Sequence, residues 1–292
     1  VRDSGSGNVV STSSLCARLL KMINEEFNFL ESNLTKTYEF LDKFASNLGY
    51  KQYPFQTDDP NSTYRSLFLE FLNRYKSVLK LLNLWTANKD DDHKILGTTL
   101  SIIRSALENY LIFNYVFINQ KINSVKGKYI FNLYLRDGYR MRIKTQGKSD
   151  FFRKIIEEDK VILEKISKEI NDLAVELNLD KKTLDDDLKQ WKPGFPKIMT
   201  IAGFGKVYTN NCYHFLSSHS HSLYQGIIQA QALMNDNDRK IEEGKLNTFL
   251  PHLITISFFY LRDLERLPIN YKLEPSDDVS KLRLFYYNLG CR

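Results

Sequence analysis

The chain has 292 residues, 42% of them hydrophobic, which is long enough to bury a sizeable core as one domain with an extension. Lysine and arginine number 41 against 35 acidic residues, and the net charge of +6 mildly favours an anionic partner. The three cysteines have no CxxC spacing and no apolar run reaches about 18 residues, so the sequence suggests no disulfide framework, zinc ribbon or membrane span and predicts a cytoplasmic protein.

The N-terminal segment, residues 1–13, is rich in serine and glycine and lacks the apolar stretch of a signal peptide. We interpret it as a disordered leader or an expression remnant. Across residues 14–292, apolar side chains recur at intervals of three and four, and no alternating strand pattern is longer than a few residues. We therefore expect a single all-α domain, a multi-helix bundle of long antiparallel helices around one central apolar helix.

Five helices are predicted first, at about residues 14–47, 63–88, 95–119, 128–144 and 150–177. Gly49 is placed to end the first of them. The third is apolar nearly all round, so it is the helix expected at the centre. After a short acidic helix or turn, the prolines and glycines of residues 191–206 predict a connection that lays Trp191 on the bundle.

The C-terminal part begins with a helix predicted from near Val207, and NDND followed by RKIEEGK, residues 235–245, is expected to end it. A last apolar helix at about residues 248–267 carries His252, Arg262 and Asp263. The densest reactive chemistry of the chain lies in the first of these helices. It is the stretch YHFLSSHSHS, residues 213–222, which holds three of the five histidines.

Within that stretch, Tyr213, Ser217 and His221 recur at every fourth position, so on a helix they share one face. His221 could act as a general acid or base near neutral pH, with Ser217 or Tyr213 as its hydrogen-bonding neighbour. A metal site from His214, His219 and His221 would need side chains to converge from mismatched helix angles. Neither a metal nor another cofactor is therefore expected.

Arg104 and Glu108 are two charges, four residues apart, in the otherwise apolar third helix. A charge in an apolar helix costs free energy unless an opposite charge or a hydrogen bond compensates it. An arginine that precedes a glutamate is also the weaker orientation for an intrahelical pair. The arginine could hold a phosphate or a carboxylate, and the glutamate could orient a histidine or act as a base. We expect the two helices to face each other and predict one buried polar site with the candidate catalytic residues Arg104, Glu108, Tyr213, Ser217 and His221. The alternatives are a structural ion pair and a core histidine that Glu108 satisfies.

A basic stripe marks the fourth predicted helix, where Arg136, Arg140 and Lys144 follow one another at intervals of four. Such a stripe could track the phosphates of a nucleic acid. A solvated helix face near Asp137 is the alternative explanation. The motifs GxxxxGK[ST], GxGxxG, HExxH and GxSxG are absent, so P-loop, Rossmann, zincin and α/β-hydrolase chemistry lack support.

The order of an R-x3-E helix, a W-x-P connection and a Y-x3-S-x3-H helix resembles an uncharacterised bacterial all-helical family, a domain of unknown function often met near phage-defence and abortive-infection genes. The matching positions are Arg104, Glu108, Trp191, Pro193, Tyr213, Ser217 and His221. The resemblance covers about residues 60–265 and implies the fold and the site. That family is loosely similar to the HEPN ribonucleases, which place an arginine and a histidine on one helix. Here no arginine precedes a histidine at that spacing, so Arg104 and His221 would have to meet from different helices.

These features predict a protein whose polar pocket binds RNA or another anionic ligand. Its enzymatic form would be a metal-independent ribonuclease in a defence or toxin context. A second copy of the chain or a defence-system protein is a further expected partner. The alternative function is a non-catalytic helical interaction or sensor module, in which the polar cluster only fixes helix register.

Overall fold

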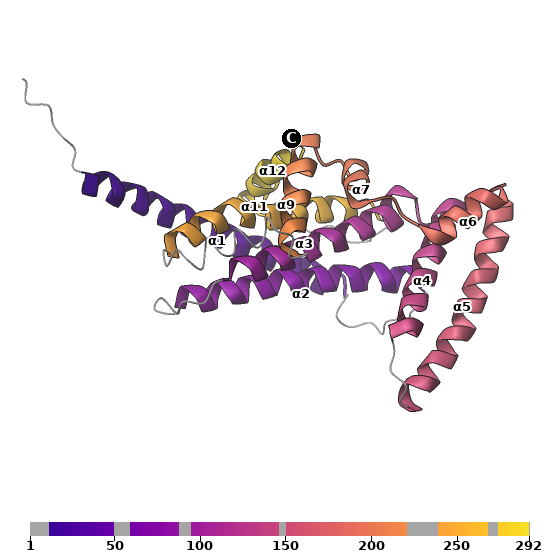
Figure 1. Ribbon diagram of the computed structural model, residues 1–292. Coiled ribbons are helices and arrows are strands. Elements are labelled where there is room, and N and C mark those ends of the chain that lie inside the picture. Colours follow the sequence, from indigo (N-terminus) through magenta and orange to yellow (C-terminus); the bar gives the residue numbers. More distant parts are fainter. Residues whose placement is uncertain are drawn as a thin grey trace, which may run out of the picture.

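A computed structural model of the protein describes residues 12–49, 59–87, 95–145, 150–220, 239–267 and 274–291. All regular structure in these ranges is helical, which confirms the predicted all-α bundle. The long helices of its body are α1 (Thr12–Asn47), α2 (Pro60–Ala87), α3 (Leu96–Phe113) and α11 (Arg239–Leu264), which run lengthwise in Figure 1. None of the described helices is long and apolar enough to cross a membrane.

Helix α3 is the central helix, as its composition predicts. It packs against α2 on one side and against α11 on another. Its inward positions Leu100, Ile103, Leu107 and Leu111 are each 0% exposed. Truncation of such side chains costs about 2–5 kcal/mol, because the cavity adds to the lost transfer free energy.

The C-terminal end of the predicted third helix is not α-helical. From Asn114 to Asn119 the chain forms a π-helix, η1, so the predicted extent is right but the hydrogen-bonding pattern differs. π-Helical turns are rare and frequently lie at functional sites. Here Asn114 donates its side-chain amide to Asp263 of α11 at 2.6 Å.

Helices α4 (Val125–Thr145), α5 (Asp150–Glu176) and α6 (Lys181–Lys189) stand together at one end of the body in Figure 1. The long hairpin of α4 and α5 is tied by a bidentate ion pair between Arg142 and Asp159, a carboxylate that is 1% exposed. Beyond α6, Trp191 lies against the rings of Tyr115 and Tyr134 and donates to Asp137 at 3.1 Å. The predicted placement of Trp191 on the bundle is therefore confirmed.

The remaining elements are α7 (Phe195–Ile201), α8 (Lys206–Tyr208), the π-helix η2 (Thr209–Tyr213), α9 (His214–Ser220) and α12 (Asp277–Gly290). Two expectations for this part were wrong. The connection of residues 191–206 contains the helix α7, and RKIEEGK begins α11. The reason for the second is tertiary, because Glu242 in that first turn accepts the Ile95 and Leu96 amide N–H groups at 2.7 and 2.9 Å and Trp85 Nε1 at 3.2 Å.

Candidate functional site

The predicted polar site depends on how α9 lies on α3, and the two helices are in contact. Apolar side chains on α9 hold it there. Leu216 is 0% exposed, and Phe215 stacks on Phe249 of α11 with ring centroids 4.1 Å apart. Tyr213, the last residue of η2, and Ser217 of α9 both approach Arg104 of α3.

Arg104 is the centre of the contact between the helices and is only 6% exposed. Its Nε and Nη2 atoms both lie 2.8 Å from Glu108 Oε1. Nη1 donates to the main-chain carbonyl of Ser217 at 3.2 Å, and the guanidinium carbon lies 5.6 Å from the centre of the Tyr213 ring. We call these four residues the α3/α9 cluster.

Glu108 and Tyr213 form the outer side of the α3/α9 cluster. The Glu108 side chain is 29% exposed, and its second oxygen, Oε2, accepts no hydrogen bond from the described residues. Burial raises the pKa of the Tyr213 phenol, the charge of Glu108 raises this pKa further, and Arg104 opposes the increase. The cluster thus combines a partly exposed carboxylate, a phenol with a raised pKa and a buried guanidinium group.

The structure brings together Arg104, Glu108 and Tyr213, and it brings Ser217 in through its carbonyl oxygen rather than its hydroxyl. His221 lies outside the described residues. It follows directly after Ser220, the last residue of α9. The catalytic roles assigned to all five residues stay predictions.

The residues of the predicted basic stripe have different surroundings. Arg136 is half-buried and donates from Nη1 to the Leu188 carbonyl at the end of α6, 3.0 Å away. Burial lowers the pKa of Arg136, and the charge of Arg140 lowers it further. Lys144 is exposed and Arg140 is partly exposed. Arg136 therefore helps to hold α6, and the nucleic-acid-binding role of the three residues stays a prediction.

A second polar cluster surrounds Asp263 on α11, and we call it the Asp263 cluster. Asp263 is 0% exposed, yet its Oδ2 accepts from Tyr110 at 2.7 Å and from Asn114 at 2.6 Å. Its Oδ1 accepts from Arg262 Nε at 2.7 Å. The sequence signal was the same as for Arg104 and Glu108, namely two charges in an apolar helix, but it did not lead us to propose a site there.

Arg262 links the Asp263 cluster to α12 and to the chain after α7. It donates to the Tyr287 hydroxyl at 3.1 Å and to the Ala202 carbonyl at 2.9 Å. Gly203 follows with a φ of 90°, a conformation that favours glycine. Burial by itself lowers the pKa of Arg262, but the neighbouring Tyr110 and Asp263 raise it overall, so the guanidinium stays charged.

Another buried group is His252 on α11, whose Nδ1 lies 3.0 Å from the hydroxyl of Tyr208. Burial lowers the pKa of His252 to about 4, so the ring is neutral near pH 7. Burial also raises the pKa of the nearby Cys212 thiol to about 12. Neither group has the properties of a reactive base or nucleophile at neutral pH.

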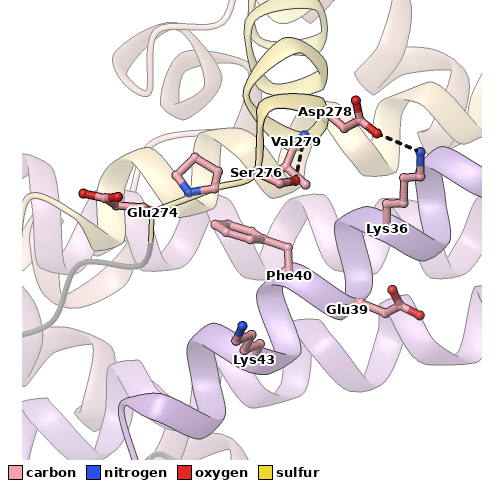
Figure 2. A pocket seen from close by; sticks show the side chains of 9 residues that line it. Lys36, Glu39, Phe40, Lys43, Glu274, Ser276, Asp278 and Val279 are labelled. Atoms are coloured by element: carbon pink, nitrogen blue, oxygen red, sulfur yellow. Dashed lines mark hydrogen bonds and ion pairs between the residues drawn. The ribbon is translucent and has the colours of Figure 1, made fainter.

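A cleft of about 580 Å³ lies between α1 and the start of α12, and Figure 2 shows its lining. Lys36 and Asp278 meet across it at 3.4 Å, and Ser276 Oγ accepts from the Val279 amide at 3.5 Å. These four groups satisfy one another at the surface. Among all the described residues, no three His, Cys, Asp or Glu side chains come together in a way that could hold a metal ion.

Residues 63–241 match a family model described as a family of unknown function, DUF5677. The matched region holds all of α3 and α9, and therefore the whole α3/α9 cluster. It also includes the positions of the R-x3-E, W-x-P and Y-x3-S-x3-H pattern. No curated protein and no solved structure shows a significant match to the chain.

Proposed function

The chain thus belongs to a family of unknown function, DUF5677, and we propose from the α3/α9 cluster that it binds RNA or another anionic ligand and cleaves RNA without a metal ion. The observation that carries the proposal is a guanidinium group held rigidly beside a partly exposed carboxylate with one oxygen left over. Glu108, Ser217 and Tyr213 use four of the five N–H groups of Arg104, which leaves one donor for a phosphate oxygen.

In this proposal each residue has a separate task. Arg104 orients Glu108 and stabilises the charge on a phosphate. Glu108 takes the proton from the ribose 2′-hydroxyl, and the 2′-oxygen attacks the phosphorus. The bond to the 5′-oxygen breaks, and His221 gives that leaving oxygen a proton as general acid. Tyr213, whose pKa is raised, donates a hydrogen bond to the phosphate. Arg140 and Lys144 on α4 supply a salt-dependent attraction for the rest of the strand.

A cleavage assay with purified protein, a labelled single-stranded RNA and EDTA tests the proposal. We expect Glu108→Gln and His221→Ala each to lower the rate about 100-fold or more, the contribution typical of a general acid or base. The matched control is Glu70→Gln on α2, which also changes the acid of an arginine pair at four-residue spacing, 3.1 Å from Arg74. Equal rates for wild type, Glu108→Gln and Glu70→Gln would rule out the catalytic role.

The cellular side of the proposal is a cytoplasmic defence or toxin effector. Expression of the wild-type chain in bacteria should slow growth and degrade RNA, and His221→Ala should restore both. Equal growth and equal RNA integrity for the two strains would remove the support for a toxin function.

One observation favours a second candidate, a non-catalytic interaction or sensor module. Arg104 holds α9 through a main-chain carbonyl, a contact that fixes the position of α9 without any chemistry at the Ser217 side chain. In that case Glu108→Gln would lower the thermal unfolding temperature while RNA binding and RNA integrity stayed at the wild-type level.

A further inference from the structure

A cleft of about 470 Å³ lies between the end of α11 and α12, apart from the α3/α9 cluster. Its size falls in the range of pockets that hold small molecules. Six residues line it: Arg262, Pro275, Ser280, Arg283, Leu284 and Tyr287. The lining therefore combines two guanidinium groups and two hydroxyl groups with apolar surface.

The charge in this lining has one sign, because the acids that pair with the two arginines are not part of it. Arg283 forms a two-point pair with Glu265, with distances of 2.9 and 2.6 Å. Arg262 pairs with Asp263, which is completely buried. Both guanidinium groups are thus held from outside the lining by carboxylates, which reduces the entropy that a bound anion would have to remove.

Donors remain free for a ligand in this arrangement. Arg283 uses two of its five N–H groups for Glu265. The Tyr287 oxygen accepts from Arg262 at 3.1 Å, so its own O–H can donate elsewhere. An anionic group that entered the cleft would meet donors of α12 beside the positive charge of Arg262 on α11.

The other part of the lining is apolar and exposed. Leu284 is 66% exposed, and Pro275 lies across the cleft at the start of α12. Phe285, the neighbour of Leu284, is 65% exposed. Two large apolar side chains next to each other on one helix are costly to leave in water, and a ligand with an apolar portion would cover part of this surface.

We propose that this cleft binds a small molecule that carries one carboxylate or phosphate group on a short apolar chain. Arg283 binds the anion, the positive charge of Arg262 attracts it, and Leu284 with Pro275 covers the apolar portion. The ligand bridges α11 and α12, which already meet through Arg262 and Tyr287.

Isothermal titration calorimetry of the full chain with hexanoate, hexyl phosphate and hexanol tests the proposal. We expect saturable binding of at least one anion and none of hexanol, because the alcohol lacks the charge that the guanidinium groups recognise. Whichever of the two anions binds more tightly identifies the source of the anionic group. Acetate should bind more weakly than hexanoate if Leu284 covers the chain. No saturable heat with either six-carbon anion would overturn the proposal, and so would equal affinity for hexanol.

Two variants of α12 separate recognition from net charge. Arg283→Gln should weaken the binding about tenfold or more, since it removes a charge-assisted donor. Lys281→Gln removes the same charge from an exposed position of α12 outside the lining and should change the affinity by less than about twofold. Equal losses in the two variants would overturn the proposal. Because Arg283 is not in the α3/α9 cluster, Arg283→Gln should also leave any RNA cleavage at the wild-type rate, so the two proposals can fail independently.

Discussion

The α3/α9 cluster and the Asp263 cluster are both built on an arginine and an acid in an apolar helix. They differ in how exposed the carboxylate is and in whether one of its oxygens accepts no hydrogen bond. In the α3/α9 cluster, Glu108 is 29% exposed and uses one oxygen. In the Asp263 cluster, the carboxylate is 0% exposed and both oxygens accept hydrogen bonds. A saturated buried carboxylate organises structure, whereas a partly exposed one with an unused oxygen can take part in binding or proton transfer. The difference predicts different costs when each acid is removed.

The largest effect is expected for Asp263→Ala, which takes the fully buried carboxylate away from Arg262 and also removes the acceptor of Tyr110 and Asn114. We expect the free energy of unfolding to fall by about 3–5 kcal/mol. Urea unfolding followed by circular dichroism measures it. The control is Glu265→Ala on the same helix end, whose pair with Arg283 is at the surface and should cost at most about 1 kcal/mol. Similar losses for the two variants would contradict the distinction between the clusters.

Removal of the other acid, by Glu108→Ala, should cost less, about 1–2 kcal/mol. Arg104 keeps the Ser217 carbonyl and the Tyr213 ring, and the exposed side of the cluster lets water replace the carboxylate. The same urea experiment applies. The double variant Arg104→Met with Glu108→Leu should recover much of this loss, because no charge is then buried without a partner. A loss as large as that of Asp263→Ala would show that Glu108 is a structural acid too.

Acidification tests a buried group of α11 that belongs to neither cluster, His252. The pKa of His252 is about 4 in the folded chain and its ordinary value is 6.5, so the unfolded chain binds more protons between these values. Stability should therefore be unaffected above about pH 7 and should fall as the pH decreases from 6.5 towards 4, by about 1–2 kcal/mol at pH 5. Unfolding midpoints measured from pH 7.5 to pH 5 check it.

The matched control for acidification is a pair of histidine variants. His252→Gln should remove this part of the pH dependence, while the same change at the exposed His214 should leave it. If both variants lose stability with pH as the wild type does, then other groups cause the acid sensitivity.

The smallest effect is expected for Ser217→Ala. Its contact with Arg104 uses the main-chain carbonyl, which alanine retains, so the free energy of unfolding should change by less than about 0.5 kcal/mol. Thermal unfolding of wild type and variant measures it. A loss above about 1 kcal/mol would mean that the hydroxyl, too, stabilises the α3/α9 cluster.

Much of the fold could be predicted because its helices have regular apolar spacing. The regular pattern located the first long helices to within a few residues and identified α3 as the central helix. Charges in apolar helices marked both Arg104 with Glu108 and Arg262 with Asp263. In contrast, α12 was missed, and the contact of Arg136 with the carbonyl of Leu188 was not predicted. Nothing local to Arg136 reveals an acceptor 52 positions away.

What the sequence by itself determined is that the chain is helical, where its first five long helices run and which helices contain costly charges, since these follow from residue type and spacing along one helix. Only the tertiary structure decided which groups pair with those charges. The partners come from far along the chain: the Ser217 carbonyl for Arg104, the Asn114 amide for Asp263, and the Ile95 amide at the start of α3 for Glu242. The physical reason is that a buried polar group is satisfied by geometry across helices, and the pattern of one helix does not specify which atom of another will face it.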